Sequence, residues 1–366
     1  MKLRMKRAGI ALATAAVLAG VVAASPALAG PADQTGGPTG GAVPVTAVAA
    51  EVTPLPLDGP PPIPPSVFER LAGPNRYATA AKVFEKGDWG PGVVLVSGEN
   101  PYDALSATPL AAYGSAPLIL TPRASLSPES RQALLKAKAN GADVVQVVGG
   151  TSSISEAVEN QVKALGFSVV VRHEGIDRYQ TAKMITGLLY DAHINQHQSM
   201  GPILFVDGTN FADALAAGPA AATKDGAIML TRGRTPLTAQ ERAYLNSLHA
   251  PKHAIGGAAV AATQGIHTER VVGTDRYDTA VEVASKYFYR PRTVVIASGL
   301  VFPDALSGGA FAANKNGPLV LTHPTSVPQP LRGYINPSEY EEIYVVGGPG
   351  SVSQRTFLEL LHEASH

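Results

Sequence analysis

The sequence predicts an α/β protein made of three tandem modules, each built on a four-stranded parallel sheet. Three observations lead to this prediction: a set of motifs that recurs three times, short apolar runs inside each repeat, and stretches of helical length between those runs. Strands that alternate with helices are joined by βαβ crossovers, which make the strands of one sheet parallel. The length of 366 residues is also too great for one average domain.

Every repeat opens on the same motif, which spans Arg70–Ala80, Arg172–Ala182 and Arg270–Ala280. Arginine, glycine, a second arginine, tyrosine, threonine and alanine stand at the same offsets in all three copies. The second arginines are about 100 residues apart, which is the size of a small domain.

Further blocks follow each opening motif in the same order: an apolar run ending in glycine, an Asp-Ala-Leu turn, an apolar run ending in threonine, and a double glycine. Short runs rich in Val, Ile and Leu and bounded by Gly or Pro are typical of strands buried on both faces. In the first repeat we expect strands around Arg70 and at 93–96, 118–121 and 144–148, each followed by a helix. Leu118–Leu120 and its counterparts are expected to be buried core strands.

The chain outside the modules has a different composition. Residues 1–29 have a basic start, an apolar stretch and an Ala-Leu-Ala cleavage site, so we expect an export signal that is removed. Residues 30–65 are rich in proline and glycine and are expected to be a disordered linker. The modules are assigned to residues 66–167, 168–266 and 267–366. No other run is long enough to span a bilayer, so no stable membrane insertion is expected after cleavage.

Composition and charge exclude several classes of protein. The absence of cysteine excludes a disulfide scaffold, a cysteine nucleophile and a zinc–thiolate site. The whole chain has 29 basic and 29 acidic residues, and loss of residues 1–29 leaves 25 basic against 29 acidic. A net-negative chain lacks the basic field of a nucleic-acid binder, so no nucleic-acid partner is expected. An anionic ligand would have to bind through a few cations focused in clefts.

Four motifs together resemble the bacterial cell wall binding repeat 2 family, whose modules occur in tandem threes on secreted and surface-layer proteins. They are the Gly-x-(Asn/Asp)-Arg-Tyr-x-Thr-Ala opening, the Asp-Ala-Leu-Ser turn, the Pro-Leu-Ile-Leu strand and the Val-Val-Gly-Gly turn. The resemblance covers about 300 residues. It implies Toprim-like modules packed as a pseudo-threefold disc within one chain, which is expected to be monomeric.

The same resemblance implies a secreted protein at the cell wall or extracellular surface. The implied partner is an anionic wall polysaccharide or a teichoic-acid-like polymer, bound non-covalently and without a cofactor. Family members usually join the modules to a separate effector region, and none is recognised in this sequence. The second repeat departs from the pattern, because Ala227 replaces the usual proline and the stretch after Gly257 is shortened. If each module carries a site, the second is expected to be the weakest.

The candidate polymer-binding residues are repeated basic, aromatic and glycine positions. Guanidiniums bind carboxylate or phosphate bidentately, and glycine turns and helix N-termini beyond the carboxyl ends of parallel strands offer N–H groups to an anion. For the arginines and tyrosines an alternative is open: the guanidinium pairs with an acid of the adjoining module and the ring packs in that contact. The candidates are Arg76, Arg178, Arg276, Arg70, Arg172, Arg270, Tyr77, Tyr179, Tyr277, Gly98, Gly299, Gly149, Gly150, Gly347 and Gly348.

Three aspartates of the Asp-Ala-Leu turns, Asp103, Asp213 and Asp304, stand where helices are expected to start. The simplest interpretation of these residues is as helix N-caps, and direct ligand contact is the alternative.

A hydrolase and an assembly block are the competing hypotheses. The last five residues match the zinc-protease motif H-E-x-x-H, but a chain terminus offers no room for a third ligand. His193 and His197 lie four residues apart in a polar run, which favours a solvated face. Neither pattern supports a catalytic or metal site, so the protein is expected not to be an enzyme. The third hypothesis is a module that mediates protein–protein contacts in a surface layer.

Overall fold

The computed structural model describes residues 65–335 and 340–365. The predicted signal and all but the last residue of the predicted linker lie outside the described residues, as does His366 of the H-E-x-x-H match. Within these two ranges no helix is long and apolar enough to cross a bilayer.

Three four-stranded sheets form the fold, and every strand pairing within them is parallel, as predicted. Sheet 1 has the order β3-β2-β4-β5, sheet 2 β7-β6-β8-β9 and sheet 3 β11-β10-β12-β1. The strands are β1 (Val67–Leu71), β2 (Gly92–Ser97), β3 (Leu118–Thr121), β4 (Val144–Val148), β5 (Val169–His173), β6 (Ile203–Asp207), β7 (Ala227–Thr231), β8 (Lys252–Ile255), β9 (Glu269–Val271), β10 (Thr293–Ser298), β11 (Leu319–Thr322) and β12 (Glu342–Val346).

Each sheet takes its last strand from the opening motif of the next repeat. Strand β5 joins sheet 1, β9 joins sheet 2, and β1 at the start of the described chain joins sheet 3 beside β12. The prediction that the strand around Arg70 belongs to the sheet of its own repeat is therefore wrong, although the number of strands per sheet is right. The repeats in the sequence and the sheets in the structure are therefore offset by one strand. The strand of each opening motif pairs with a strand of another repeat.

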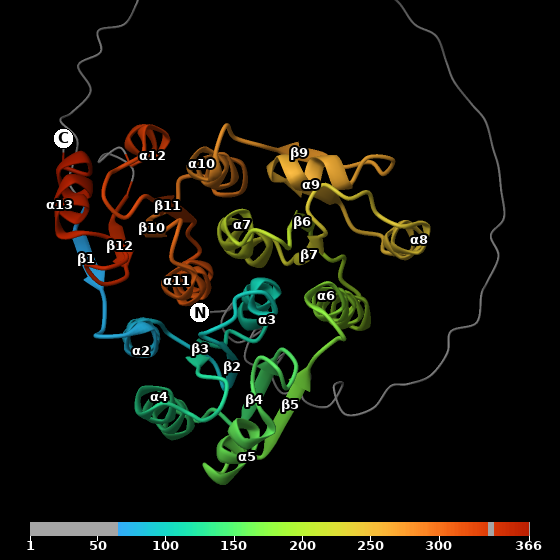
Figure 1. The fold of residues 1–366 in the computed structure, drawn as a ribbon, viewed down its shortest axis with the longest axis horizontal. Coiled ribbons are helices and arrows are strands. Elements are labelled where there is room, and N and C mark those ends of the chain that lie inside the picture. Colours follow the sequence, from blue (N-terminus) through green and yellow to red (C-terminus); the bar gives the residue numbers. More distant parts are fainter. Residues whose placement is uncertain (1–64, 336–339, 366) are drawn as a thin grey trace, which may run out of the picture.

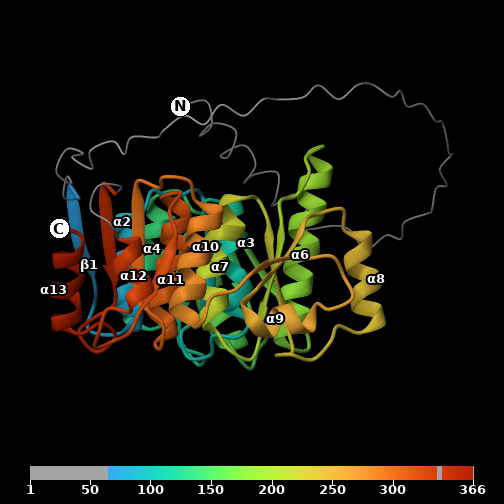
Figure 2. The ribbon, with the colours of Figure 1, turned by 90° about the horizontal axis from the view of Figure 1, so that it is seen from above.

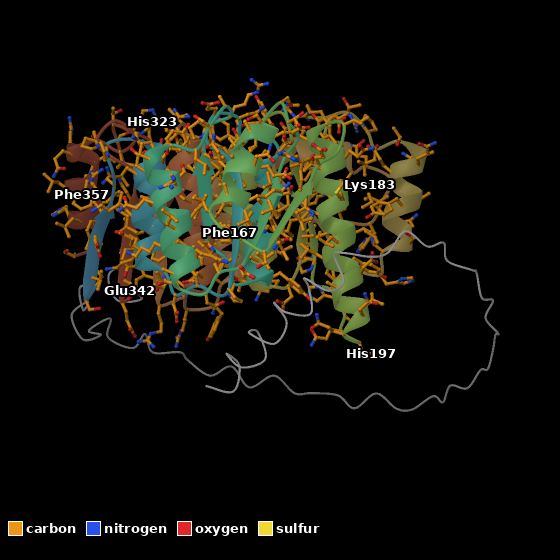
Figure 3. All side chains as sticks on the ribbon, turned by 90° about the horizontal axis from the view of Figure 1, so that it is seen from below. Phe167, Lys183, His197, His323, Glu342 and Phe357 are labelled. Carbon is orange, nitrogen blue, oxygen red and sulfur yellow. The ribbon has the colours of Figure 1, made fainter. Side chains whose placement is uncertain are left out.

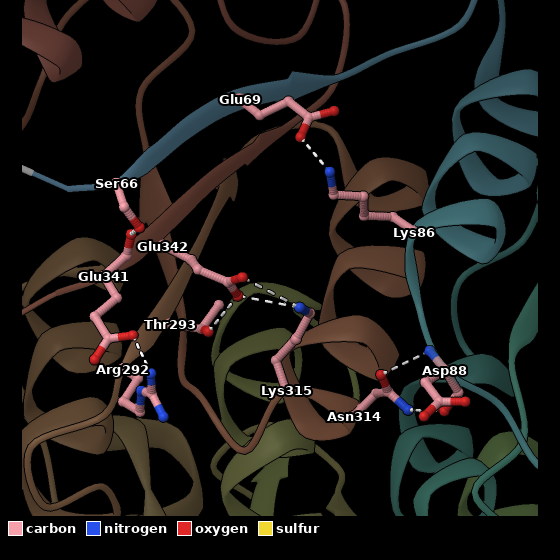
Figure 4. A network of polar contacts seen from close by, with 10 residues as sticks. All are labelled: Ser66, Glu69, Lys86, Asp88, Arg292, Thr293, Asn314, Lys315, Glu341 and Glu342. Carbon is pink, nitrogen blue, oxygen red and sulfur yellow. Dashed lines mark hydrogen bonds and ion pairs between the residues drawn. The ribbon is translucent and has the colours of Figure 1, made fainter.

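The exchange of strands closes the three sheets into a ring (Figure 1). Where β1 meets β12, polar contacts join residues from the start of the described chain to residues near its end. The hydroxyl of Ser66 donates to the carbonyl of Glu341 at 2.8 Å, and Asn314 donates to the carbonyl of Asp88 at 2.7 Å (Figure 4). Strand β1 covers the edge of β12 and becomes the edge strand of sheet 3 itself.

The helices are α2 (Arg76–Lys86), α3 (Ala107–Tyr113), α4 (Pro128–Ala139), α5 (Glu156–Ala164), α6 (Arg178–Asn195), α7 (Ala212–Thr223), α8 (Ala239–Ser247), α9 (Gly256–Ala262), α10 (Arg276–Tyr287), α11 (Phe302–Asn314), α12 (Gln329–Tyr334) and α13 (Gln354–Glu363). Helices α3, α7 and α11 meet at the centre of the ring (Figure 1). They are rich in Ala, Gly and Ser, so their backbones approach closely: a Cβ on Gly218 would lie 3.0 Å from Cβ of Thr108.

The second unit breaks the threefold similarity at two places. Helix α6 has 18 residues against 11 in α2 and 12 in α10, and it projects beyond one face of the disc (Figure 2). Helix α9 begins directly at Gly256, where the other units insert a loop before α5 and α13. The core strands are buried as expected, including Leu118, Ile119 and Leu120.

Candidate functional site

The predicted site residues gather where two neighbouring units meet, at the carboxyl ends of the strands. This face carries His323, whereas Glu342 at the start of β12 and His197 at the end of α6 lie on the opposite face (Figure 3). At each meeting point the opening motif of one repeat faces the Asp-Ala-Leu segment of another. We call these places junctions 1–2, 2–3 and 3–1 after the units that meet there.

Local hydrogen bonds explain the opening motif. Asn75, Asp177 and Asp275 are helix N-caps whose side chains accept from backbone N–H groups. The motif threonine accepts from the motif glycine: Gly73 N–H donates to Thr79 Oγ1 at 3.1 Å, and the same bond recurs in the other two repeats. The loop and the first helical turn are thereby fixed together, which places the arginine and tyrosine that lie between.

The second motif arginines bind their own repeat. One guanidinium nitrogen of Arg178 donates to the carbonyl of Gly208 at 2.9 Å, and Arg276 donates to Gly299 at 2.8 Å. Arg76 makes the same bond to Gly98. No ion pair within 4.0 Å joins these three guanidiniums to a carboxylate among the described residues. Arg76 and Arg276 nevertheless lower the pKa of Asp304 and Asp213, acids of the adjoining modules. Each guanidinium has five N–H donors, and the bond to the glycine carbonyl uses one.

The motif tyrosines pack against the glycines that end β2, β6 and β10. A Cβ on Gly98 would lie 2.6 Å from the ring of Tyr77, and the corresponding distances are 2.7 Å for Gly208 with Tyr179 and 2.9 Å for Gly299 with Tyr277. Any side chain at these positions would displace the ring. Glycine is therefore required here for close packing of the tyrosine rather than for an outward N–H group.

The structure contradicts the expectation that backbone N–H groups of the glycine turns face a ligand. The N–H of Gly98 donates to Thr121, that of Gly299 to Thr322 and that of Gly149 to His173. Gly347 N–H likewise donates to the carbonyl of Leu71. These donors complete the sheet, so the arginine side chains are the main anion-binding groups left at the junctions. Gly150 and Gly348 follow in the turns, where their carbonyls accept from the residues that lead into α5 and α13.

The interpretation of the three aspartates as N-caps is wrong. Asp103 caps no N–H group with its side chain, and Asp213 and Asp304 lie inside α7 and α11. Asp103 instead accepts from Ser153 at 2.7 Å and, across junction 1–2, from Thr181 at 3.2 Å. Both residues recur in every repeat of the sequence, the aspartate in the Asp-Ala-Leu turn and the threonine in the opening motif. Only the tertiary structure shows that the two side chains are hydrogen-bonded.

Asp304 has the same role at junction 3–1. It is buried, accepts from Ser351 and has Arg76 and Thr79 of the first repeat nearby. Burial raises the pKa of this carboxyl, while Ser351 and Arg76 partly oppose the rise. A buried carboxylate that is hydrogen-bonded across a contact fixes the relative position of the two units.

Junction 2–3 lacks these hydrogen bonds. The shortened loop before α9 contains no serine equivalent to Ser153, and Asp207 replaces the serine that ends β2 and β10. Burial and the neighbouring Asp207 raise the pKa of Asp213 to about 6, with Arg276 opposing the rise. The three junctions are thus chemically unequal, and the second unit is the one that departs, as the sequence indicated.

The first motif arginines have separate positions. Arg70 donates to the carbonyls of Gly347 and Val352 at 2.8 Å each, and its guanidinium stacks on Phe357 at 4.4 Å. Arg172 donates to Gly149 at 2.7 Å and pairs with Glu159. Arg270 is exposed, because the short α9 leaves no equivalent of Glu159 or Phe357 beside it. Arg70 and Arg172 therefore hold the glycine turns in place.

The hydrolase patterns do not form a site within residues 65–335 and 340–365. No group of three or more His, Cys, Asp or Glu side chains in this part of the chain is arranged to hold a metal ion. Glu363 of the H-E-x-x-H match pairs with Arg332. The solvated face predicted for His193 is wrong, because α6 continues to Asn195 and buries this side chain.

The fold and the repeated junctions define a protein of three cell wall binding modules, and the chain belongs to the family described as cell wall binding domain 2 (CWB2). The family model matches residues 70–159, 172–264 and 270–357, which confirms the family that the motifs predicted. The described part of the chain accordingly consists of cell wall binding domains.

Two curated relatives come from Bacillus subtilis (strain 168). N-acetylmuramoyl-L-alanine amidase LytC is 27% identical over 298 residues, which cover 80% of this chain and 58% of that protein. The amidase enhancer is 27% identical over 298 residues, 79% of this chain and 39% of the relative. The chain thus spans about half the length of these relatives.

Two solved structures from Clostridium difficile share the fold. Cwp6 has a TM-score of 0.72 at 22% identity and covers 82% of this chain and 48% of its own. Cwp8 has a TM-score of 0.68 at 24% identity and covers 81% of this chain and 51% of its own.

Proposed function

We propose that this protein attaches non-covalently, and without catalysis, to an anionic secondary polymer of the wall through the junctions between its repeats. The proposal rests on the hydrogen bonds and the missing ion pairs of Arg76, Arg178 and Arg276. Each donates at the strand ends to a glycine carbonyl and has no ion pair to a carboxylate among the described residues. The guanidinium of Arg178 also stacks on the ring of Tyr102 at 3.4 Å. A guanidinium positioned in this way can bind a carboxylate or phosphate of the polymer with its remaining donors.

Charge supports a focused rather than a diffuse mode of binding. The repeats together are not basic, so long-range attraction to a polyanion is weak. Three arginines on one face provide repeated contacts for a repeating polymer, and simultaneous contacts raise the overall affinity even where each is weak. Junction 2–3 is the least favourable for an anion, because Asp213 lies near both Arg276 and a second carboxylate, Asp207.

The test replaces Arg76, Arg178 and Arg276 together by alanine and measures sedimentation of the protein with purified walls. We expect binding to be lost, because the anion-binding groups are removed, and wild-type binding to weaken as salt is added. The matched control replaces three exposed arginines outside the repeated motifs, Arg131, Arg290 and Arg355, and lowers the net charge equally. A folded junction triple variant that still sediments with walls contradicts the proposal.

Walls from which secondary polymers have been chemically stripped separate this function from the alternatives. Loss of binding on stripping supports the anionic polymer as partner. Binding that persists instead indicates the glycan backbone or a protein partner, as expected of an assembly block. Turnover in a wall-lysis assay, with stoichiometric zinc in the purified protein, would show a hydrolase.

A further inference from the structure

The face of the disc opposite the junctions contains a cavity of about 510 Å³ on the central axis. It lies where α3, α7 and α11 end, and the projecting end of α6 forms one of its walls. All three repeats contribute to its lining. This volume falls within the range of small-molecule sites and far exceeds that of a bare metal ion.

The three central helices end in the same way at this cavity. The residue after each helix cap has a left-handed backbone, with φ of 50° at Ser115, 54° at Asp225 and 54° at Asn316. In each case the next residue donates its N–H back to the helix, as Gly226 does to the carbonyl of Ala221 at 2.8 Å. Glycine is the usual residue in this conformation, which costs other residues about 1–2 kcal/mol. Here the position instead carries three polar side chains, and all three line the cavity.

A buried histidine also lines the cavity. His193 is 4% exposed, and its Nδ1 donates to the carbonyl of Leu189 at 2.7 Å. In the neutral ring Nε2 therefore carries a lone pair, and no described residue donates a hydrogen bond to it. Thr223 adds a buried hydroxyl oxygen, also without a partner among the described residues. Nε2 of His193 is not one of the fully buried atoms without a partner, so it is accessible in the cavity and can accept a hydrogen bond from a ligand.

The position of His193 depends on a feature of the second repeat alone. The long α6 carries this residue about one turn beyond the level at which α2 and α10 end. Gln196 and Gln198, which follow in the same segment, also line the cavity. The three similar helix ends come from all three repeats. The extra length of α6 adds further polar side chains to the cavity, and it occurs in the second repeat alone.

The electrostatics of the cavity favour a cation. Three helices present the negative ends of their dipoles to one place. Asp225 adds a full negative charge, and no described residue forms an ion pair with it. Burial, together with Asp225, raises the pKa of Tyr113 in the cavity wall, while Gln196 opposes the rise. Of the two nearest lysines, Lys315 is paired with Glu342, and Lys224 is exposed and outside the lining.

We propose that this cavity binds a small polyhydroxylated molecule with a protonated amino group, that is, an amino sugar. The ammonium group would donate to Asp225 and to the helix carbonyls, and a hydroxyl group would donate to His193 Nε2. The rings of Trp89 and Tyr113 in the wall suit the apolar face of a sugar ring and the positive charge beside it. The site is separate from the polymer-binding junctions, because it lies on the other face of the disc.

The test is calorimetric titration of the full chain with glucosamine, glucose and N-acetylglucosamine. We expect saturable binding of glucosamine, and binding at least tenfold weaker for the two neutral sugars, because they lack the charged donor. Equal binding of glucose and glucosamine, or no saturable binding of glucosamine at millimolar concentration, overturns the proposal.

Two variants assign the binding to the cavity. Asp225→Asn removes the charge with a residue that tolerates the left-handed backbone, and His193→Asn retains a donor for the carbonyl of Leu189 while removing the Nε2 acceptor. Each should weaken glucosamine binding about tenfold. The charge-matched control Asp191→Asn, on α6 but outside the cavity lining, should leave it unchanged. Wild-type affinity in both folded cavity variants overturns the proposal, and wall sedimentation of these variants is expected to be normal.

Discussion

Junction 2–3 makes a quantitative prediction, because its partly buried carboxyl, Asp213, lacks the hydrogen-bond partners found at the other two junctions. We expect Asp213→Asn to stabilise the protein at neutral pH. A tenfold change in proton affinity is worth about 1.4 kcal/mol, so a pKa moved from 3.8 to about 6 makes the folded state about 3 kcal/mol less stable at pH 7.5 than an ordinary carboxyl would.

The sign follows from which state binds the proton more tightly. The folded pKa is raised, so this group destabilises the fold progressively as pH rises from about 4 to about 6, and by a constant amount above that range. Asparagine resembles the protonated carboxyl at every pH. The variant should therefore exceed wild type by about 1–3 kcal/mol at pH 7.5 and by about half as much at pH 5.

The assay is urea unfolding of both proteins at pH 5 and pH 7.5, compared as a difference so that titration of all other groups cancels. Asp103→Asn is the matched control at the equivalent position of junction 1–2. Its carboxylate accepts from Ser153 and Thr181, so that variant should lose stability rather than gain it. The reasoning is refuted if Asp213→Asn gives no gain at pH 7.5, or an equal gain at both pH values.

The other predictions concern ring closure and glycine packing. Arg70→Met should lower the free energy of unfolding by about 3 kcal/mol, because it removes charged hydrogen bonds to the turn after β12 while keeping a side chain against Phe357; a change below about 1 kcal/mol in urea unfolding would contradict this role. Gly317→Ala should destabilise by about 1–3 kcal/mol, since its Cβ would lie 2.2 Å from the carbonyl oxygen of Thr293. Gly257→Ala, in α9 with no atom within 4 Å of the added Cβ, should instead raise the melting temperature; a loss of stability there would mean that the α9 glycines have another role.

The sequence predicted the local structure of the modules well, because that structure depends on local signals. Apolar runs such as Val93–Val96 became buried strands, and the capping residues Asn75, Asp177 and Asp275 start helices through bonds to N–H groups two or three residues ahead. Three copies of the same motifs made each assignment threefold redundant. The family followed from the same motifs.

The candidate site was only partly predictable. The repeated Arg and Tyr positions do lie together at the strand ends, but the glycines around them have packing roles and their N–H groups are used within the sheets. Asp103 and Asp304 appeared to be caps because an Asp before Ala-Leu is a common helix start. Their real partners, Thr181 and Thr79, lie in another repeat, and no local pattern specifies such a contact.

The sequence by itself determined the three modules, their parallel sheets and their family, since periodicity, caps and glycine turns act over a few residues. Only the tertiary structure decided which strands share a sheet. Strand β1 pairs with β12 near the other end of the chain, and β5 and β9 likewise join the sheet of the preceding repeat. A strand pairs with whichever sheet edge lies beside it in the folded chain, and that neighbour can be distant in the sequence. The same long-range closure creates both the junctions and the axial cavity.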